Sequence, residues 1–406
     1  MKLLILTQYY PPEIGAPQNR LHELAVRLKD EGVDVEVLTA MPNYPIMEIF
    51  EAYKNGKINQ EIIDGVKVHR SRIYVSNSKG IISRLLNYFS FVFTSYFKGR
   101  SLGRFDFLMV ESPPLFLGYS AMALSRKLKS KLIFNVSDLW PESADKLGIV
   151  TNKILLNFAY NLEKKCYIKA HLITGQTNGI VNDISLRFPT KKVFWLPNGV
   201  DLNYYNPEKI VGNNFRTKNS FTDEDMLFFY GGILGFAQGL QIILKAAKLV
   251  EKFPLAQFII QGSGPEKEKL LKLKDELKLN NVHFLNPVSK SEMPSLLKEI
   301  DVALVPLRKL DLFKGAIPSK VFESLAMEKP LLLGVDGEAK EHFIQNAEAG
   351  LFFEPENEVD LSEKIIYLLA NKSEIVRMGK NGRIYVNEYF NRNKIAQEFY
   401  EILLKC

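Results

Sequence analysis

Short apolar runs alternate with amphipathic stretches along the first half of the chain. The amphipathic stretches have helical periodicity and separate most of the apolar runs, notably at 16–31, 115–129 and 153–168. This alternation predicts a parallel sheet with helices on both faces. Because the crossovers of such sheets are right-handed, we expect ligands at the carboxyl ends of the strands. The predicted strands are 2–6, 34–39, 67–73, 105–111, 131–137 and 171–175.

The segment 195–208 interrupts this alternation, since it holds two prolines, one glycine and three asparagines. The pattern then restarts, and three helical stretches close the chain from 358 to 405. We therefore predict an α/β protein with two doubly wound, Rossmann-like domains, 1–198 and 199–406, and a crevice between them. We leave open whether the last helix packs back on the N-terminal domain. The strands predicted for the second domain are 226–232, 257–264, 282–286, 301–307, 330–335 and 350–354.

Glycines stand where predicted strands give way to helices. Gly15 precedes a helix that begins near Pro17, Gly232 lies in "YGGILGFAQG", and Gly262 lies in "QGSGPE". Glycine lets backbone N–H groups approach an anion, and a helix N-terminus adds partial positive charge. A single loop of this kind is usually a plain turn, and none completes a G-x-G-x-x-G pattern. Three of them at carboxyl strand ends favour a phosphate-bearing ligand.

The segment "AIPSKVFESLAMEKP", residues 316–330, places three polar groups at the start of a predicted helix. Ser319 can cap the helix, and Lys320 lies in its first turn. The macrodipole disfavours a cation there unless an anion also binds; otherwise Lys320 extends into solvent. Glu323, one turn later, can accept two hydrogen bonds from a ribose diol, or it can pair with a nearby lysine. Together the three residues predict a site for a nucleoside diphosphate.

The net charge of +7, with a pI of about 9.0, comes from lysines and arginines spread along the chain. Such a surface is either simply solvated or has affinity for anions such as phosphorylated substrates and acidic lipids. We find no nucleic-acid motif and expect no nucleic acid as a partner. The two cysteines, Cys166 and Cys406, and the five histidines show neither disulfide nor metal spacing. We therefore expect a reducing cytoplasm and no bound metal.

The segment "KGIISRLLNYFSFVFTSYFKGR", residues 79–100, predicts a helix with little polar surface. Its longest uncharged apolar run, 85–97, is too short to span a bilayer. One interpretation is a helix buried against the first sheet; the other is an interfacial helix on an anionic membrane, with basic residues meeting the lipid. One apolar line is formed by Ile81, Leu85, Phe89, Val92 and Tyr96, a second by Ile82, Leu86, Phe93 and Phe97, and the flanking cations are Lys79, Arg84, Lys98 and Arg100.

Four motifs in this order, "LPNGVD", "YGGILGFAQGL", "QGSGPE" and "PSKVFESLAMEKP", resemble the retaining glycosyltransferases of family four, which have the GT-B fold. Two more, "YYPPEIGAPQNR" and "SDLWPES", resemble a bacterial branch that builds O-antigen and capsule polysaccharide. That branch includes N-acetylfucosamine transferases that act on lipid-linked sugars. The resemblance covers nearly the whole chain.

The resemblance implies that Glu323 holds the donor ribose. It also implies that Gly15, with Asn19 as a further candidate beside it, lets backbone amides meet the diphosphate. The segment near Val288 would cradle the base. In this family the attack comes from the same face as the leaving group, and no protein nucleophile is established.

The chain departs from the family pattern at three positions. Ile233 and Gln238 stand where most members carry Arg and Lys, and Gly315 stands where the first of two glutamates is usual. Two cations that grip the diphosphate are therefore missing. Lys320, with Ser319, is our candidate for the lost charge. The missing glutamate leaves open which sugar is held, and how.

Two carboxylates in "VSDLWPES", Asp138 and Glu142, follow a predicted strand and are expected to face the crevice, where they can orient acceptor or donor hydroxyls. A helix cap is an equal alternative for Asp138, and core packing is the preferred interpretation of Trp140. The "DED" at 223–225 imitates a metal motif, but it precedes a strand and is interpreted as a solvated turn.

The sequence thus predicts a retaining glycosyltransferase that moves a sugar from a nucleotide-sugar donor, a UDP-N-acetyl sugar, to a polyprenyl-diphosphate-linked glycan in O-antigen or capsule biosynthesis. It would need no metal and would work in the cytoplasm, peripherally on the inner face of the membrane. The alternatives are a sugar-nucleotide epimerase of the same fold and a non-catalytic UDP-binding protein of the membrane surface. The candidate catalytic residues are Asp138, Glu142 and Lys320. The candidate substrate-binding residues are Gly15, Asn19, Gly232, Gln238, Gly262, Val288, Ser319, Lys320 and Glu323.

Overall fold

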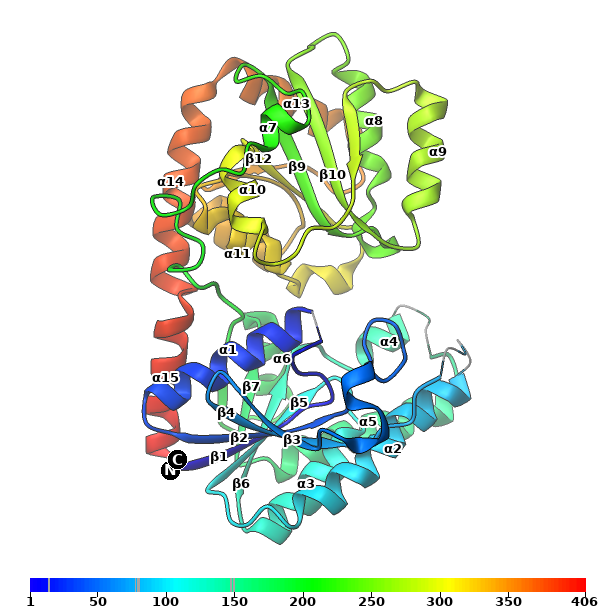
Figure 1. The fold of residues 1–406 in the computed structure, drawn as a ribbon, viewed down its shortest axis with the longest axis vertical. Coiled ribbons are helices and arrows are strands. Elements are labelled where there is room, and N and C mark those ends of the chain that lie inside the picture. Colours follow the sequence, from blue (N-terminus) through cyan, green and yellow to red (C-terminus); the bar gives the residue numbers. More distant parts are fainter. Residues whose placement is uncertain (14, 77, 79–80, 147, 149) are drawn as a thin grey trace. The chain divides into compact units, whose positions relative to one another are not determined.

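The computed structural model describes residues 1–406 apart from 14, 77, 79, 80, 147 and 149. Its contacts divide the chain into two compact units (Figure 1). Unit 1 comprises residues 1–198 and 393–406, and unit 2 comprises residues 199–392. The division falls after Asn198, inside the segment rich in proline and asparagine, and the C-terminal helix joins the first unit.

Unit 1 is built on an eight-stranded sheet with the order β3-β4-β2-β1-β5-β6-β7-β8. All neighbours are parallel except β3 and β4, which form a hairpin through Asp64 and Gly65, both at positive φ. The predicted parallel sheet thus has one antiparallel strand at its edge, where an Asp-Gly pair supplies the tight turn. The strands are β1 (Lys2–Leu6), β2 (Asp34–Ala40), β3 (Gln60–Ile63), β4 (Val66–Ser71), β5 (Phe107–Ser112), β6 (Lys131–Val136), β7 (Leu172–Gly175) and β8 (Val193–Trp195).

Helices cover both faces of this sheet, because its central strands are apolar on both sides and must be buried twice. One face packs against α1 and α15, through Leu21, Leu24 and Phe399 among others. The other face packs against α2, α3 and α5, through Phe91, Leu124 and others (Figure 1). The helices are α1 (Ala16–Asp30), α2 (Ile81–Gly99), α3 (Leu117–Leu128), α4 (Glu142–Lys146), α5 (Lys153–Lys169), α6 (Asn178–Arg187) and α15 (Arg392–Lys405).

Unit 2 has a six-stranded, all-parallel sheet with the order β11-β10-β9-β12-β13-β14. The predicted fold of two Rossmann-like domains is confirmed. The strands are β9 (Met226–Ile233), β10 (Ala256–Ser263), β11 (Val282–Leu285), β12 (Val302–Pro306), β13 (Leu331–Gly334) and β14 (Gly350–Phe352). The helices are α7 (Phe215–Lys218), α8 (Gln241–Leu249), α9 (Lys267–Leu277), α10 (Met293–Glu299), α11 (Ser319–Ala326), α12 (Glu338–Lys340), α13 (Glu358–Ala370) and α14 (Lys372–Tyr389).

Candidate active site

Two glycines bring the carboxyl ends of β9 and β10 into close contact. Gly232 and Gly262 are paired across the two strands, at φ values of 142° and 153°. A Cβ atom on Gly262 would lie 1.8 Å from the carbonyl oxygen of Gly232. Any other residue would push the strands apart, so both glycines are required for this open backbone edge.

Helix α11 begins beside this edge, and its start differs from the prediction. Pro318 occupies the N-cap position and Ser319 is the first helical residue; no side chain caps the first turn. The prediction that Ser319 caps the helix is therefore wrong, because proline takes the position before it. The N–H of Val321 donates to the carbonyl oxygen of Pro318 at 3.0 Å, and the N-terminus of a helix without a side-chain cap suits an anion.

Lys320 extends from this first turn back toward β9. Its Nζ lies 3.6 Å from the centroid of the Tyr230 ring, and a Cβ atom on Gly232 would be only 3.1 Å from it. Burial lowers the pKa of Lys320 to about 7, and the nearby Glu323 carboxylate opposes that shift only in part. The side chain is therefore held between an aromatic ring and the glycine edge, where an added anion would restore its charge.

Glu323 lies one helical turn after Lys320 and is half-buried. Its carboxylate accepts a hydrogen bond from the hydroxyl of Tyr205. Burial raises the pKa of Glu323, while Arg392, Lys290, the Tyr205 bond and Lys320 act against the rise. Lys320 and Glu323 line one small cavity of about 30 Å³. A cation and a carboxylate that can accept two hydrogen bonds thus lie one helical turn apart and line the same cavity.

The other unit 2 candidates lie in loops that follow strands of the sheet. Gln238 ends a 3-10 turn, Phe236–Gln238, in the loop after β9, and Val288 is half-buried in the loop after β11. Ile233 is 61% exposed, so no apolar contact replaces the missing cation at that position. Arg308, which sequence reasoning missed, stacks on the Phe236 ring at 4.1 Å and so brings a guanidinium to this loop.

A larger cavity, of about 420 Å³, lies where β12, β13 and β14 end. The short 3-10 helix Asp311–Gly315 forms part of its wall, together with Arg308 and Asp336. Gly315, the position of the missing glutamate, therefore belongs to an element that lines this cavity. The charged side chains that line the cavity can hydrogen-bond the hydroxyl groups of a sugar.

The unit 1 candidates lie at the carboxyl edge of their own sheet. Gly15 is the N-cap residue of α1, and the N–H of Asn19 donates to its carbonyl oxygen at 3.1 Å. Asp138 follows β6, is exposed, and accepts a hydrogen bond from the Ser143 hydroxyl. Glu142 begins α4 and forms an ion pair with Lys146 at 2.6 Å.

Both halves of the chain match models of known families. Residues 15–199 match the glycosyl transferase 4-like domain, and residues 212–385 match the glycosyl transferases group 1. The chain is a glycosyltransferase of the GT-B type. It is 25% identical over 334 residues to a protein of Escherichia coli K12 named as a colanic acid biosynthesis glycosyl transferase, WcaI, covering 80% of this chain and 81% of that protein.

Two further matches have informative names. The glycosyltransferase is 29% identical over 147 residues to the N,N'-diacetylbacillosaminyl-diphospho-undecaprenol alpha-1,3-N-acetylgalactosaminyltransferase of Campylobacter jejuni, which covers 36% of each chain. Its fold matches that of Anabaena Alr3699/HepE in complex with UDP and glucose, with a TM-score of 0.72, 17% identity and full coverage of both chains.

A buried polar network in unit 1 of the glycosyltransferase was not anticipated. Arg20 of α1 donates to Glu111 at 2.6 Å and to Ser137 at 2.7 Å, and Asn135 also donates to Glu111. The side chains of Arg20, Glu111 and Asn135 are at most 5% exposed. Because Ser137 precedes Asp138, the network fixes the loop that carries both candidate carboxylates. The partners lie far apart in sequence, so no local pattern could have revealed them.

A second anchor holds the loop before α1. The carboxylate of Glu13, in the "YYPPE" motif, accepts hydrogen bonds from the backbone N–H groups of Tyr10, Asn43 and Tyr44 at 2.8–3.2 Å. Burial raises the pKa of Glu13, and these three bonds act against the rise. Glu13 therefore links the loop after β1 to the loop after β2. The sequence signal that could have indicated this link is a single carboxylate directly after two prolines.

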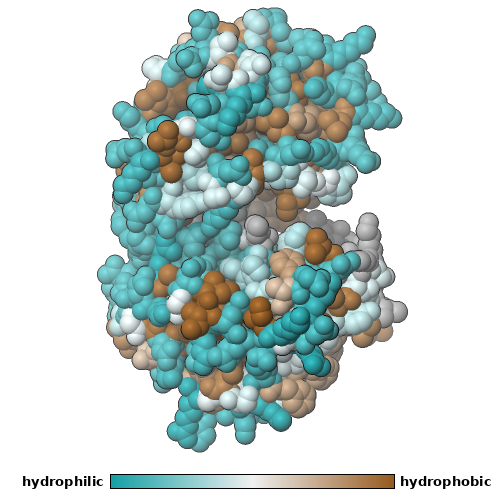
Figure 2. All heavy atoms as spheres, viewed as in Figure 1, coloured by the Kyte–Doolittle hydropathy of each residue, from teal (hydrophilic) through white to brown (hydrophobic). Residues whose placement is uncertain are grey.

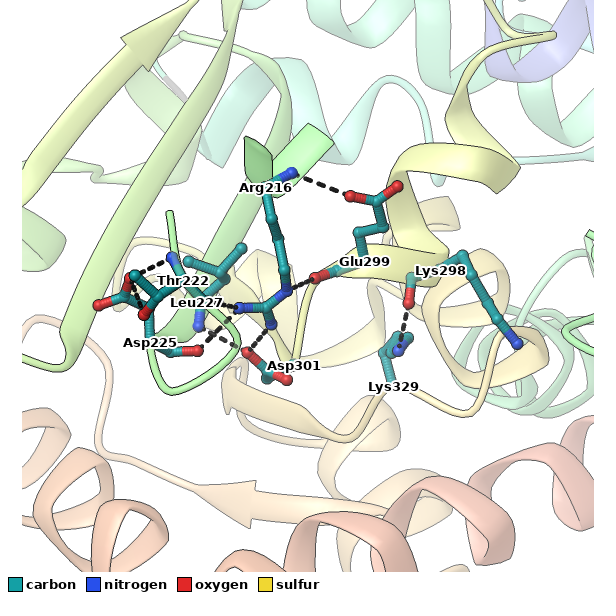
Figure 3. Close-up of polar contacts among 8 residues, drawn as sticks. All are labelled: Arg216, Thr222, Asp225, Leu227, Lys298, Glu299, Asp301 and Lys329. Atoms are coloured by element: carbon teal, nitrogen blue, oxygen red, sulfur yellow. Dashed lines mark hydrogen bonds and ion pairs between the residues drawn. The ribbon is translucent and has the colours of Figure 1, made fainter. Parts of the chain in front are cut away.

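The "DED" segment belongs to a structural network at the opposite, amino-terminal edge of the unit 2 sheet (Figure 3). Asp225 accepts hydrogen bonds from the N–H and hydroxyl of Thr222, which confirms the predicted turn. Arg216 donates to the carbonyl oxygens of Thr222, Asp225 and Glu299 at 2.8–2.9 Å, and to the Asp301 carboxylate at 2.7 Å. This network joins α7, β9, α10 and β12 and lies away from the strand ends that bear the site.

Helix α2 has buried side chains on one side and exposed side chains on another. Phe91 and Val92 are buried, and Phe89 packs on Phe116 with ring centroids 4.9 Å apart. Phe93 and Phe97 are instead 63% and 56% exposed. Leu85, Phe89, Val92 and Tyr96 of the first line thus pack against the core, as the buried-helix interpretation predicts for that line. Lys79 and the side chains of Ile81, Ile82 and Arg84 lie outside what the structure describes.

Neither a membrane span nor a metal cluster appears in the part of the glycosyltransferase that the structure describes. Its helices lack the combination of length and apolar character that crossing a bilayer requires. Its His, Cys, Asp and Glu side chains do not gather in threes around a point that could hold a metal ion.

We expect the glycosyltransferase to take up protons when it binds a UDP-N-acetylhexosamine near pH 7. The pKa of Lys320 is lowered to about 7 in the free protein, and an adjacent diphosphate would raise it, so the complex holds more protons. Affinity should fall as pH rises above 7, by up to about tenfold per pH unit. Calorimetry in buffers of different ionisation enthalpy measures the uptake, which Lys320→Met should abolish. A pH-independent affinity without proton uptake would contradict a diphosphate beside Lys320.

Proposed function

We propose that this glycosyltransferase transfers a sugar, with retention, from a UDP-N-acetyl sugar to a polyprenyl-diphosphate-linked glycan. The reaction belongs to O-antigen or capsule biosynthesis, on the inner face of the cytoplasmic membrane. The names of the similar proteins support the class of donor, the class of acceptor and the link to polysaccharide biosynthesis. The Campylobacter relative's name specifies an N-acetylgalactosamine group and an undecaprenol-diphosphate acceptor, the Escherichia coli relative's name specifies colanic acid, and the Anabaena structure contains UDP.

The observation that carries the proposal is the pair formed by Lys320 and Glu323 beside Gly232. The ammonium group and the carboxylate lie one helical turn apart and line a common cavity with Gly231, and Lys320 Nζ also lies next to Gly232. A diphosphate would accept hydrogen bonds from the start of α11 and neutralise Lys320, while Glu323 would accept from the ribose hydroxyls. We assign the donor's sugar to the cavity beside the Asp311–Gly315 helix.

The chemistry then depends on charge that develops on the departing diphosphate. As the bond between the anomeric carbon and the phosphate oxygen breaks, the N–H groups of α11 and a protonated Lys320 stabilise the leaving group in place of a metal ion. The acceptor oxygen bonds to the anomeric carbon on the same face of the sugar, and its proton passes to the oxygen of the departing diphosphate. Asp138 and Glu142 would orient that hydroxyl.

Glu323→Gln is expected to weaken UDP binding by about 1.5–3 kcal/mol, because a hydrogen bond to a charged group is lost. Calorimetry with UDP and with 2′,3′-dideoxy-UDP tests this assignment. If Glu323 binds the ribose, removing the two hydroxyls should weaken binding to the wild type but have little further effect on the variant.

The matched control is Glu341→Gln, an exposed glutamate of the same unit. It should leave UDP affinity unchanged. A folded Glu323→Gln protein with wild-type affinity for UDP would disprove the ribose assignment.

A further inference from the structure

Helices α2, α3 and α5 lie side by side as one layer on unit 1 (Figure 1). The hydroxyls of Ser95 in α2 and Ser120 in α3 are hydrogen-bonded at 2.8 Å. On the other side of α3, Gly118 lies directly against Cys166 of α5. The layer buries one face in the core and presents the other to solvent.

The outer side of this layer carries no exposed acidic residue. The sequences of α2 and α3 contain no Asp or Glu, and α5 contains only Glu163, which is 1% exposed and paired with Arg187. Exposed basic residues are frequent by contrast. Those on the helices or directly after them are Arg100, Arg126, Lys127, Lys129, Lys153, Lys164, Lys165 and Lys169.

Large apolar side chains are exposed on the same layer. On α2, Leu86, Phe93 and Phe97 recur at spacings of seven and four residues, which places them on one helical face, and they are 49–63% exposed. On α5, Ile154 and Phe158 are 81% and 46% exposed. Figure 2 shows hydrophobic residues (brown) among hydrophilic residues (teal) on the visible surface of unit 1.

The opposite layer shows that this composition is not general to the unit. The exposed residues of α1 and α15 include Asp30, Glu398 and Glu401 as well as lysines. Basic residues near helix C-termini are common because they complement the macrodipole. That rule does not account for the missing acids or for the exposed aromatic rings.

We propose that the α2–α3–α5 layer is the face on which the protein docks to an anionic phospholipid bilayer. The inference rests on the proposed function, since a polyprenyl-linked acceptor presents its sugar diphosphate at such a surface. The basic residues would be attracted to the anionic headgroups, while Phe93, Phe97 and Phe158 enter the boundary between headgroups and acyl chains. Both forces act on one face, so the bilayer would meet the protein in a single orientation.

Flotation with phosphatidylcholine vesicles, with and without phosphatidylglycerol, tests the proposal. The wild type should bind only the anionic vesicles at low salt and dissociate at about 1 M salt, where the Debye length is about 3 Å. Lys164→Glu with Lys165→Glu should lower the affinity for anionic vesicles at least about thirtyfold, because the attraction of each lysine to the headgroups contributes about fivefold. Phe93→Ser with Phe97→Ser should lower it by about tenfold or more.

Matched variants on the opposite layer are the controls. Lys394→Glu with Lys405→Glu makes the same change of charge, and Leu404→Ser removes an apolar residue that is 62% exposed. Both should bind anionic vesicles within about twofold of the wild type. A wild type that ignores anionic vesicles, or a control that loses as much affinity as the α5 variant, overturns the proposal. UDP binding is measured on every protein, so loss of docking and failure of the donor site remain distinguishable.

Discussion

Lys320→Met is expected to lower the rate of sugar transfer by about 10²–10³ without lowering the stability of the fold. The reason is the position of Lys320, with Nζ over the Tyr230 ring and next to Gly232, where a departing diphosphate would meet it. Burial lowers the pKa of Lys320, which means that keeping its ammonium group charged costs free energy in the folded protein. Methionine has similar length and no charge, so the variant should be at least as stable at pH 7. Steady-state kinetics and thermal unfolding measure the two effects.

The control for this variant is Lys248→Met. Lys248 also belongs to unit 2, but its side chain is 41% exposed and paired with Glu251. Its replacement should change neither the rate nor the melting temperature appreciably. If Lys320→Met retains wild-type turnover, the charge on the leaving group is stabilised elsewhere, and Arg308 is the next residue to test.

Arg216→Met is expected to lower the free energy of unfolding by about 3–5 kcal/mol, because it leaves a half-buried carboxylate and three carbonyl oxygens without their donor. Arg216 is 16% exposed, and Asp301, its ion-pair partner, also accepts the N–H of Leu227 (Figure 3). The network lies at the edge of the sheet away from the candidate site. Where the variant remains folded, its KM for the donor should therefore match that of the wild type, and denaturant titration measures the loss of stability.

A matched control is Arg377→Met, which removes an arginine that is 46% exposed and paired with Glu348 and Glu374. Its loss should cost about 1 kcal/mol or less. Equal destabilisation by the two substitutions would show that the Arg216 network contributes no more than a surface ion pair.

The sequence predicted the central strands well because they are buried on both faces and appear as continuous apolar runs. It missed β3, which begins with two polar residues, and β8, whose apolar run has only three residues; neither strand is fully buried. Helix α2 shows a further limit: its periodicity located two apolar lines, but only the packing of α3 against it decides which one is buried.

The site was predictable to the extent that it is local. Lys320 and Glu323 lie on one helix, so their spacing alone placed them together, and the glycines of β9 and β10 identified the open edge. Tyr205, which bonds Glu323 from over a hundred positions away, and the contacts of Arg20 with Glu111 and Ser137 depend on the tertiary fold. A single sequence contains no pattern that links such distant residues.

Proton NMR of the purified protein with a UDP-N-acetylhexosamine, with and without a short-chain prenyl-diphosphate-linked sugar, tests the central claim most directly. We predict that UDP is released only when the acceptor is present, and that the new glycosidic proton shows the anomeric configuration of the donor. Conversion of the UDP-sugar without acceptor would indicate an epimerase instead. Binding of UDP without release from any UDP-sugar, or a product of inverted configuration, would contradict the proposed retaining transfer.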